Sequence, residues 1–267
     1  MEVKDSATNV WKIQSLERGL KLLELIAEQS GGCTAKWLSK VSNINLSTCY
    51  HLLNTLDVAG YVEKDKVTQN YFLTYKVAYL NNLVQSRRAI PQKITTLAGT
   101  LAQKSRETAY VSTWDRGEVV IRYIVESDRA VKVRSLYVGY WDHGFLRAMG
   151  KAILAHVSAD ELDEYRATHI PEQRTPNSKV NWGEIEEEMR ITRGRGYSVD
   201  NQEYEIDVCG IAAPIFQFDG SVWGAISIAM PSSRFNDSDD TMIAYLKGEA
   251  LAASLSLGYQ LRSFKEV

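Results

Sequence analysis

Hydrophobic and polar positions in the N-terminal part of the chain follow a helical period. Between residues 15 and 29, Leu16, Leu20 and Leu23 recur at spacings that place them on one face of a helix. Ser15 is a suitable N-cap residue, and a pair of glycines follows the segment. We therefore expect a first helix over residues 15–29, with these three leucines and Ile26 or Ala27 on one face.

Two more helices are expected before residue 60. Thr34 is a suitable cap for the second helix, and Asn45 or Ser47 for the third, which stops at Gly60. A short polar turn joins the two helices, and this arrangement is typical of a helix-turn-helix. The second helix of such a pair lies in the major groove of DNA.

A hairpin follows the three helices. Residues 61–63 and 71–73 are rich in aromatic and branched side chains and flank a polar tip. The order of helices and hairpin predicts a winged helix-turn-helix over residues 10–75. A small three-helix interaction domain that binds no DNA is the alternative that periodicity alone leaves open.

The side chains expected to contact DNA come from the second helix, the third helix and the tip of the hairpin. Those of the third helix point away from its leucines, and the lysines of the tip would contact phosphates. The predicted residues are Lys36, Ser47, Thr48, Tyr50, His51, Asn54, Lys64 and Lys66.

The rest of the chain interleaves helices and strands. Residues 76–93 have the pattern of a linker helix, and residues 94–264 are expected to form a second domain. Its strands and helices do not follow a strict βαβ repeat, which favours an α+β fold with a mostly antiparallel sheet. Strands are expected at residues 111–114, 119–124, 131–135, 210–218 and 222–229, and helices at 94–107, 182–192 and 241–261.

Composition narrows the class of protein but does not identify it. Hydrophobic residues make up 45% and charged residues 24% of the 267 residues, as in globular proteins. Cys33, Cys49 and Cys209 are far apart and odd in number, so a disulfide framework is not expected. The start of the chain has no apolar signal segment, and no apolar run approaches the ~20 residues of a membrane span. We expect a cytoplasmic protein with no membrane partner.

Net charge neither requires nor excludes nucleic acid. The whole chain carries −2, and residues 11–75 contain seven Lys or Arg against six Asp or Glu. A few well-placed cations, amides and hydroxyls are enough to contact phosphates, so their placement decides more than their sum.

Short motifs along nearly the whole chain resemble the IclR family of bacterial transcription regulators. Each is weak alone, but their order and spacing are specific. They are SLERGLKLLE at 15–24, LST at 46–48, LLNTL at 52–56, GYV at 60–62, YFL at 71–73, GKAILA at 150–155, RGYSVDNQE at 195–203, IAAPIF at 211–216 and AISI at 225–228.

The resemblance implies a winged helix-turn-helix, a linker helix and a C-terminal GAF/PAS-like domain that binds a small organic acid. It also implies a homodimer or dimer of dimers on palindromic, double-stranded operator DNA, acting on catabolic operons. The residues that match the effector pocket of the family are Ala148, Met149, Asp200, Val208, Gly210 and Ser227.

The chain departs from the family pattern at both sites. Residues 46–59 contain no Lys or Arg, so the operator sequence cannot be carried over from the family. The family often has a second small hydroxyl two residues after Ser227, where this chain has Ala229. Arg147 is the nearest candidate to replace it, because a guanidinium pairs with a carboxylate through two hydrogen bonds. A surface or ion-paired arginine is the alternative.

Aromatic side chains near these motifs suggest a flat ligand. Trp141, Phe145, Tyr204 and Trp223 are close in sequence to the matched positions, although core packing is the alternative role for them. We therefore expect a transcriptional repressor controlled by an aromatic carboxylate such as a hydroxybenzoate. A regulator that responds to a small aliphatic acid, and a ligand-binding interaction module without DNA binding, are the alternatives.

No enzyme chemistry is expected. Cys209 has no neighbouring base in the sequence that would activate it as a nucleophile, and the four histidines lack a metal-ligand spacing. We expect no catalytic residue, no metal and no cofactor.

Overall fold

A computed structural model describes residues 2–4, 11–87, 90–235 and 239–260. The chain divides into two compact units, Met1–Ala89 and Ile90–Val267, and each is described by itself. The outer ends of the predicted domains at residues 10 and 264, and the linker residues 88–89, lie outside the described residues.

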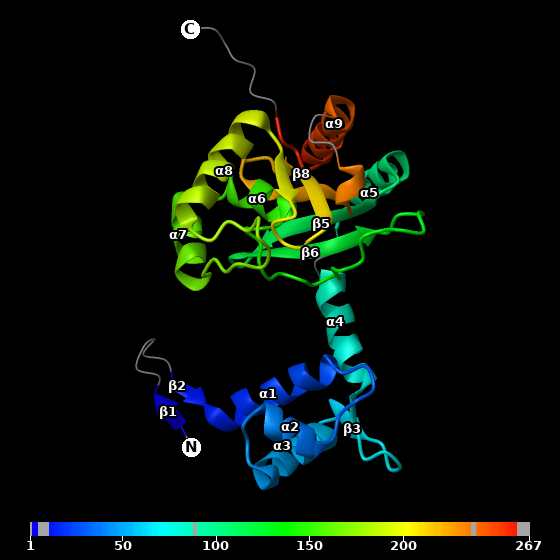
Figure 1. Ribbon diagram of the computed structural model, residues 1–267, viewed down its shortest axis with the longest axis vertical. Helices are drawn as coiled ribbons and strands as arrows, with labels where there is room; N and C mark the ends of the chain where they lie inside the picture. The colour runs from blue at the N-terminus through cyan, green and yellow to red at the C-terminus, as the bar shows by residue number, and fades with distance from the viewer. Residues whose placement is uncertain (1, 5–10, 88–89, 236–238, 261–267) are drawn as a thin grey trace. The chain divides into compact units, whose positions relative to one another are not determined.

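The first unit contains the expected helices and hairpin (Figure 1). Two short strands pair at its start, and the hairpin strands pair antiparallel, with Val62 opposite Leu73. The elements are β1 (Glu2–Lys4), β2 (Trp11–Ile13), α1 (Gln14–Ala27), α2 (Ala35–Val41), α3 (Leu46–Val58), β3 (Val62–Lys64), β4 (Tyr71–Leu73) and α4 (Tyr75–Arg87).

The core-facing side of α1 differs from the expected one. Leu22, Leu25 and Ile26 are buried, whereas Leu16 and Leu20 are 59% and 52% exposed. Leucine is so frequent in this helix that two different sets of apolar residues recur at the helical period. Packing against α3 and β4 buries the set that contains Leu22, Leu25 and Ile26. Of the face expected from the sequence, Ile26 is therefore buried, whereas Leu16 and Leu20 are not.

The linker segment is not one helix. Helix α4 ends at Arg87, and α5 (Gln92–Ser105) begins after Pro91, which occupies its N-cap position. A residue that precedes proline avoids the helical conformation, so a helix over residues 76–93 was not compatible with Pro91.

The second unit is built on one five-stranded sheet in which every neighbouring pair is antiparallel, as expected. Its strand order is β6-β5-β9-β8-β7. The strands are β5 (Thr108–Asp115), β6 (Glu118–Val125), β7 (Ser198–Asn201), β8 (Val208–Phe216) and β9 (Val222–Pro231).

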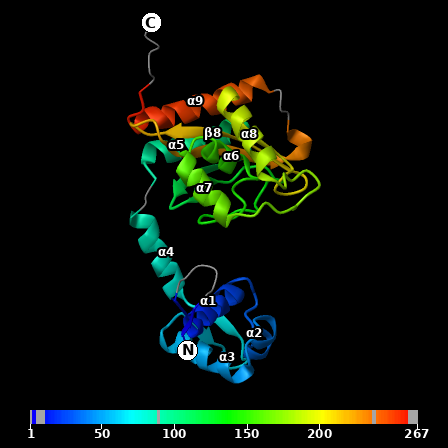
Figure 2. The ribbon, with the colours of Figure 1, turned by 90° about the vertical axis from the view of Figure 1, so that its left-hand side faces the viewer.

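Each face of this sheet packs on a separate hydrophobic cluster. Helices α5 and α9 (Asp240–Ser256) cover one face. Helices α6 (Ala148–Leu154), α7 (Ala159–Thr168) and α8 (Trp182–Arg195) cover the other, together with the irregular segment before α6; we call this second side the α6 face. Figure 2 shows α9 and α7 on opposite sides of the sheet.

The second unit differs from expectation in several parts, and α7 and β7 were not among the expected elements. Residues 131–135 form no strand, because side chains from elsewhere bond to their carbonyl groups: Thr108 Oγ1 donates to Val133 O and Arg234 Nη2 to Val131 O. The short helix α6 was not predicted, since all seven of its residues are buried and it has no polar face. Among the described helices, none is long and apolar enough to cross a membrane.

Candidate functional site

Capping residues determine where the two helices of the helix-turn-helix begin. The Thr34 side chain accepts a hydrogen bond from Trp37 N at 3.2 Å, and Asn45 Oδ1 accepts one from Thr48 N at 2.8 Å. Asn45 rather than Ser47 therefore starts α3. Buried Cys49 and Leu53 fix the inner side of this helix and so determine which side chains point outward.

The outer side of α3 presents a polar stripe. Its members recur at helical spacing, so they share one face, and all are exposed: Ser47, Tyr50, His51 and Asn54. Thr48 is half-buried at the edge of this stripe. The helix thus offers hydroxyl, imidazole and amide groups of the kind that hydrogen-bond to base edges and phosphates.

The hairpin has an ordered tip that holds two cations outward. The carboxylate of Asp65 accepts hydrogen bonds from the amides of Val67 and Thr68, and these bonds lower its pKa. Lys64 and Lys66 flank Asp65, and both are exposed, as is Lys36 on α2. All eight residues predicted to contact DNA lie on the first unit, and seven of them are exposed.

In the second unit, Arg147 precedes α6 and is 2% exposed. Its Nη2 donates to the carbonyls of Trp141 at 2.9 Å and Val119 at 3.4 Å, and its guanidinium lies over the Tyr140 ring at 5.0 Å. In the part of the chain that the structure describes, no carboxylate pairs with Arg147 and its Nε has no partner. Burial lowers the pKa of this guanidinium.

Two buried hydroxyls on the same face of the sheet also lack partners among the described residues. Tyr110 on β5 and Ser227 on β9 are directly opposite each other, and both are at most 1% exposed. Neither Tyr110 Oη nor Ser227 Oγ makes a hydrogen bond. Burial raises the pKa of Tyr110, so its hydroxyl keeps its proton.

Met149 connects Arg147 to the sheet. Its sulfur lies 3.7 Å from Arg147 Nη1 and accepts a hydrogen bond from Ser112 Oγ at 2.8 Å. Ser112 is two residues after Tyr110 on β5, so both side chains point to the α6 face. The guanidinium and the free hydroxyl of Tyr110 therefore lie over the same side of one strand.

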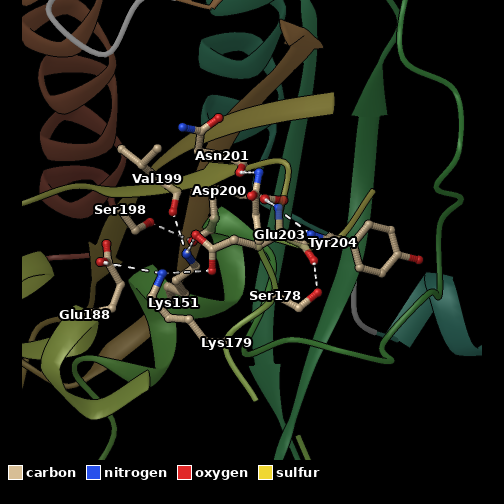
Figure 3. A network of polar contacts seen from close by, with 12 residues as sticks. Lys151, Ser178, Lys179, Glu188, Ser198, Val199, Asp200, Asn201, Glu203 and Tyr204 are labelled. Atoms are coloured by element: carbon tan, nitrogen blue, oxygen red, sulfur yellow. Dashed lines mark hydrogen bonds and ion pairs between the residues drawn. The ribbon is translucent and has the colours of Figure 1, made fainter. Parts of the chain in front are cut away.

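A buried ion pair involves Lys151 in the middle of α6. Lys151 is fully buried and donates to Glu203 Oε1 at 2.5 Å and to Val199 O at 2.6 Å (Figure 3). The other oxygen of Glu203 pairs with Lys179 at 3.1 Å. Burial lowers the pKa of Lys151, and Glu203 opposes that effect.

Asp200 belongs to the same network. Its Oδ1 accepts hydrogen bonds from Glu203 N at 2.8 Å and Tyr204 N at 3.4 Å, which closes the turn after β7. Burial raises its pKa to about 6, against the opposing effect of Lys151. In Figure 3 the Tyr204 ring points away from Lys151, and its hydroxyl meets that of Tyr140 at 2.6 Å.

Gly150 is required by close packing. A Cβ atom at this position would lie 1.8 Å from the carbonyl oxygen of Gly144. The backbone before Arg147 is thereby held against α6, which explains the glycine at residue 150.

Comparisons with known proteins agree with this architecture. Residues 83–256 match the profile described as the C-terminal domain of the bacterial transcriptional regulator IclR, and residues 15–66 match the IclR helix-turn-helix domain. The chain belongs to the IclR family of transcriptional regulators.

Several relatives of known sequence or structure match nearly the full length of the chain. An uncharacterised HTH-type regulator of Haemophilus influenzae is 30% identical, covering 97% of this chain and 98% of its own. The Escherichia coli DNA-binding transcriptional repressor YiaJ is 28% identical over 93% and 89% of the two chains. The crystal structure of the Thermotoga maritima IclR superposes with a TM-score of 0.73 at 26% identity, covering 93% and 100%.

Membership of the IclR family confirms the winged helix-turn-helix and the GAF/PAS-like α+β domain, and it makes the chain a regulator rather than an enzyme. The structure also shows the physical role of two of the family motifs. Residues 150–155 and 195–203 contain the two ends of the buried pair Lys151–Glu203, and they are joined through Val199 and Asp200.

The residues expected to bind the effector are only partly brought together. Gly210 lies beside Ala148 and Asp200, since a Cβ atom on it would be 3.5 Å and 4.0 Å from their Cβ atoms. Val208 is on the same face of β8 as Gly210, at the end of the strand. Arg147 and Met149 meet each other, and Ser227 lies on β9 over the same face of the sheet.

The aromatic side chains expected to line the effector pocket do not all lie on the α6 face. Trp223 packs with the cluster on the opposite face, because a bulge after Ile215 changes the alternation of β9. Trp141 is 50% exposed and, with Phe145, lines an outer cavity beside His169. The prediction that Trp223 lines the pocket, which rested on its closeness in sequence to the matched residues, was therefore wrong.

Sequence reasoning missed the tyrosines at 110 and 140. Tyr110 lies within a strand whose neighbours are all buried, and nothing in the local sequence distinguishes it from a core residue. The surface alternative for Arg147 is excluded by its burial. Among the described residues no carboxylate forms a direct ion pair with it, although Asp142 and Glu118 interact with it electrostatically.

Proposed function

We propose that this IclR-family protein is a repressor of a catabolic operon, acting in the cytoplasm and controlled by a small organic acid. The acid binds over the α6 face of the sheet in the second unit. Its binding changes the affinity of the helix-turn-helix for operator DNA. This coupling requires the acid to bind the DNA-competent and DNA-free arrangements with different affinity.

The observation that carries the proposal is the buried guanidinium of Arg147 without a carboxylate partner in the described residues. A charge removed from water is costly unless it is paired. The carboxylate of a ligand would supply this partner, and it would form charge-assisted hydrogen bonds with the guanidinium. Two relatives are named as repressors, YiaJ and the Escherichia coli IclR, and they support repression rather than activation.

Within this class we propose an acid with an apolar or aromatic body, of which a hydroxybenzoate is an example. The surroundings of Arg147 are rich in aromatic and sulfur-containing side chains: Tyr140 lies under the guanidinium and Met149 beside it. Such surroundings favour a ligand with a small charged end and a less polar remainder.

We also propose a homodimer or a dimer of dimers on a palindromic operator. One recognition helix reads only a half-site, and two half-sites about one helical turn apart are the usual arrangement for such helices. Light scattering should show an assembly larger than a monomer, with protection of symmetric half-sites in a footprint.

The acid site can be tested with one substitution. A thermal-shift screen of small carboxylic acids identifies binders, because a ligand of the folded state raises the unfolding temperature. Arg147→Met should weaken the best of these acids about 10- to 100-fold in calorimetry, since hydrogen bonds to charged groups contribute ~1.5–3 kcal/mol. Its DNA affinity without acid should stay unchanged.

Arg174→Met is the matched control. Its guanidinium also lies over a tyrosine ring, that of Tyr204 at 4.5 Å, but the residue is exposed. This variant should bind the acid like the unmodified protein. Equal affinity of the Arg147 and Arg174 variants for every acid would refute the site.

A further inference from the structure

A cavity of about 360 Å³ lies over the strands β5 and β6, beneath the irregular segment that contains residues 133–138. Its walls are mixed: Ile124, Val133 and Leu136 are apolar, whereas Glu126 and Arg134 are charged. Tyr110 lines the cavity from β5, opposite Ile124 in the strand register. The space is therefore on the α6 face, where Arg147 also lies.

Two other polar residues that line this cavity, Thr108 and Glu126, already have partners. Thr108 Oγ1 donates to Val133 O at 3.1 Å and accepts from Ser127 N at 3.3 Å. The Glu126 carboxylate pairs with Lys132 at 2.9 Å and with Arg134 at 3.2 Å. Among the buried side chains that line the cavity in the described structure, the Tyr110 hydroxyl is the polar group left without a hydrogen bond.

A buried hydroxyl without a partner destabilises a folded protein, so it calls for an explanation. Tyr110 is fully buried, and burial raises its pKa, so the group is a neutral donor in the physiological range. Because the Glu126 carboxylate lines the same cavity, the Tyr110 hydroxyl is better suited to an uncharged oxygen of a ligand than to a second carboxylate. Ser227 Oγ, directly opposite on β9, is also free to bond in the described structure.

We propose that Tyr110 determines effector specificity by donating a hydrogen bond from Oη to an uncharged oxygen of the acid, either a hydroxyl or a carbonyl. This proposal rests on the proposed function, in which Arg147 binds the carboxylate. Ser112, which contacts Met149 beside Arg147, is two residues from Tyr110 along β5. Two residues of a strand span about 7 Å, so the proposal requires an acid long enough to reach from Arg147 into the cavity lined by Tyr110.

The test compares acids that differ only in that oxygen. Calorimetry would measure binding of benzoate against 4-hydroxybenzoate, and of valerate against 5-hydroxyvalerate and 4-oxovalerate. In the unmodified protein, at least one oxygenated acid should bind about 10- to 100-fold more tightly than its plain partner, because loss of the ligand oxygen leaves the buried hydroxyl unpaired. Tyr110→Phe should reduce this preference to less than about threefold.

Tyr137→Phe is the matched control, because it removes a hydroxyl from the same cavity wall at a residue that is 64% exposed. It should keep the full preference for the oxygenated acid. Tyr110→Phe should unfold at the same temperature as the unmodified protein or higher, since it removes an unpaired hydroxyl. A fall of several degrees would show that the hydroxyl has a structural role, and would overturn the proposal.

The outcomes separate this inference from the proposed function. If the acids bind through Arg147 but Tyr110→Phe keeps the preference, or if the unmodified protein shows none, Tyr110 is not the specificity residue and the acid site stands. If none of the acids binds the unmodified protein and Arg147→Met changes nothing, both the acid site and the role of Tyr110 are overturned.

Discussion

Glu203→Leu should lower the free energy of unfolding of the second unit by about 3–5 kcal/mol, because it leaves a fully buried ammonium without its counter-ion. Lys151 has no solvent exposure, and Glu203 Oε1 is 2.5 Å from its Nζ. Val199 O would remain as a neutral acceptor, which compensates only part of this cost. Urea denaturation followed by circular dichroism would measure the change.

Glu187→Leu is the control on an exposed pair. Glu187 bonds Arg190 through both oxygens, yet both side chains are more than half exposed, so the unfolding midpoint should hardly move. The double variant Lys151→Met with Glu203→Leu should recover much of the stability, since apolar residues often replace a buried ion pair without penalty. A cost below about 1 kcal/mol for Glu203→Leu would contradict the network in Figure 3.

Thr48→Ala combined with His51→Ala should weaken specific operator binding by about 2–6 kcal/mol, since each side chain that reads a base edge contributes ~1–3 kcal/mol. Both residues lie in the first two turns of α3, which contains no lysine or arginine to compensate. Fluorescence anisotropy with labelled operator DNA would measure the change. Acid binding and the unfolding temperature should be unaffected, because neither side chain is in the core of the first unit.

Thr55→Ala removes a hydroxyl from the last turns of the same helix, where it bonds His51 O. This control should leave operator affinity within about twofold, as expected for a surface substitution outside the DNA-reading stripe. If the double variant binds the operator as tightly as this control, then α3 does not read DNA through the stripe assigned to it.

Features set by local sequence were predictable. Thr34 and Asn45 cap helices with their own side chains, so the helix-turn-helix could be delimited from neighbouring residues. The buried face of α1 was not predictable. Two sets of leucines fit the helical period, and only packing against α3 and β4 determines which set is buried.

The candidate site was predictable only where a motif marked it. Arg147 was singled out by its place before Gly150, but its burial without a carboxylate results from hydrogen bonds to Val119 and Trp141, which are remote or unpatterned in sequence. Tyr110 was missed because a strand buried on both faces carries no alternation to show which side chain is special. Trp223 was misplaced because a bulge reverses the alternation of β9.

The central claim is that one chain couples an acid site to a DNA site, and anisotropy with DNA from upstream of its own gene tests it directly. The best acid from the thermal-shift screen would be titrated into the complex. The account predicts at least a tenfold change in DNA affinity at saturating acid, a coupling of about 1.4 kcal/mol, with the same factor in acid affinity when DNA is bound. Arg147→Met should bind this DNA normally and show no response. Tight acid binding that leaves DNA affinity unchanged would contradict the account.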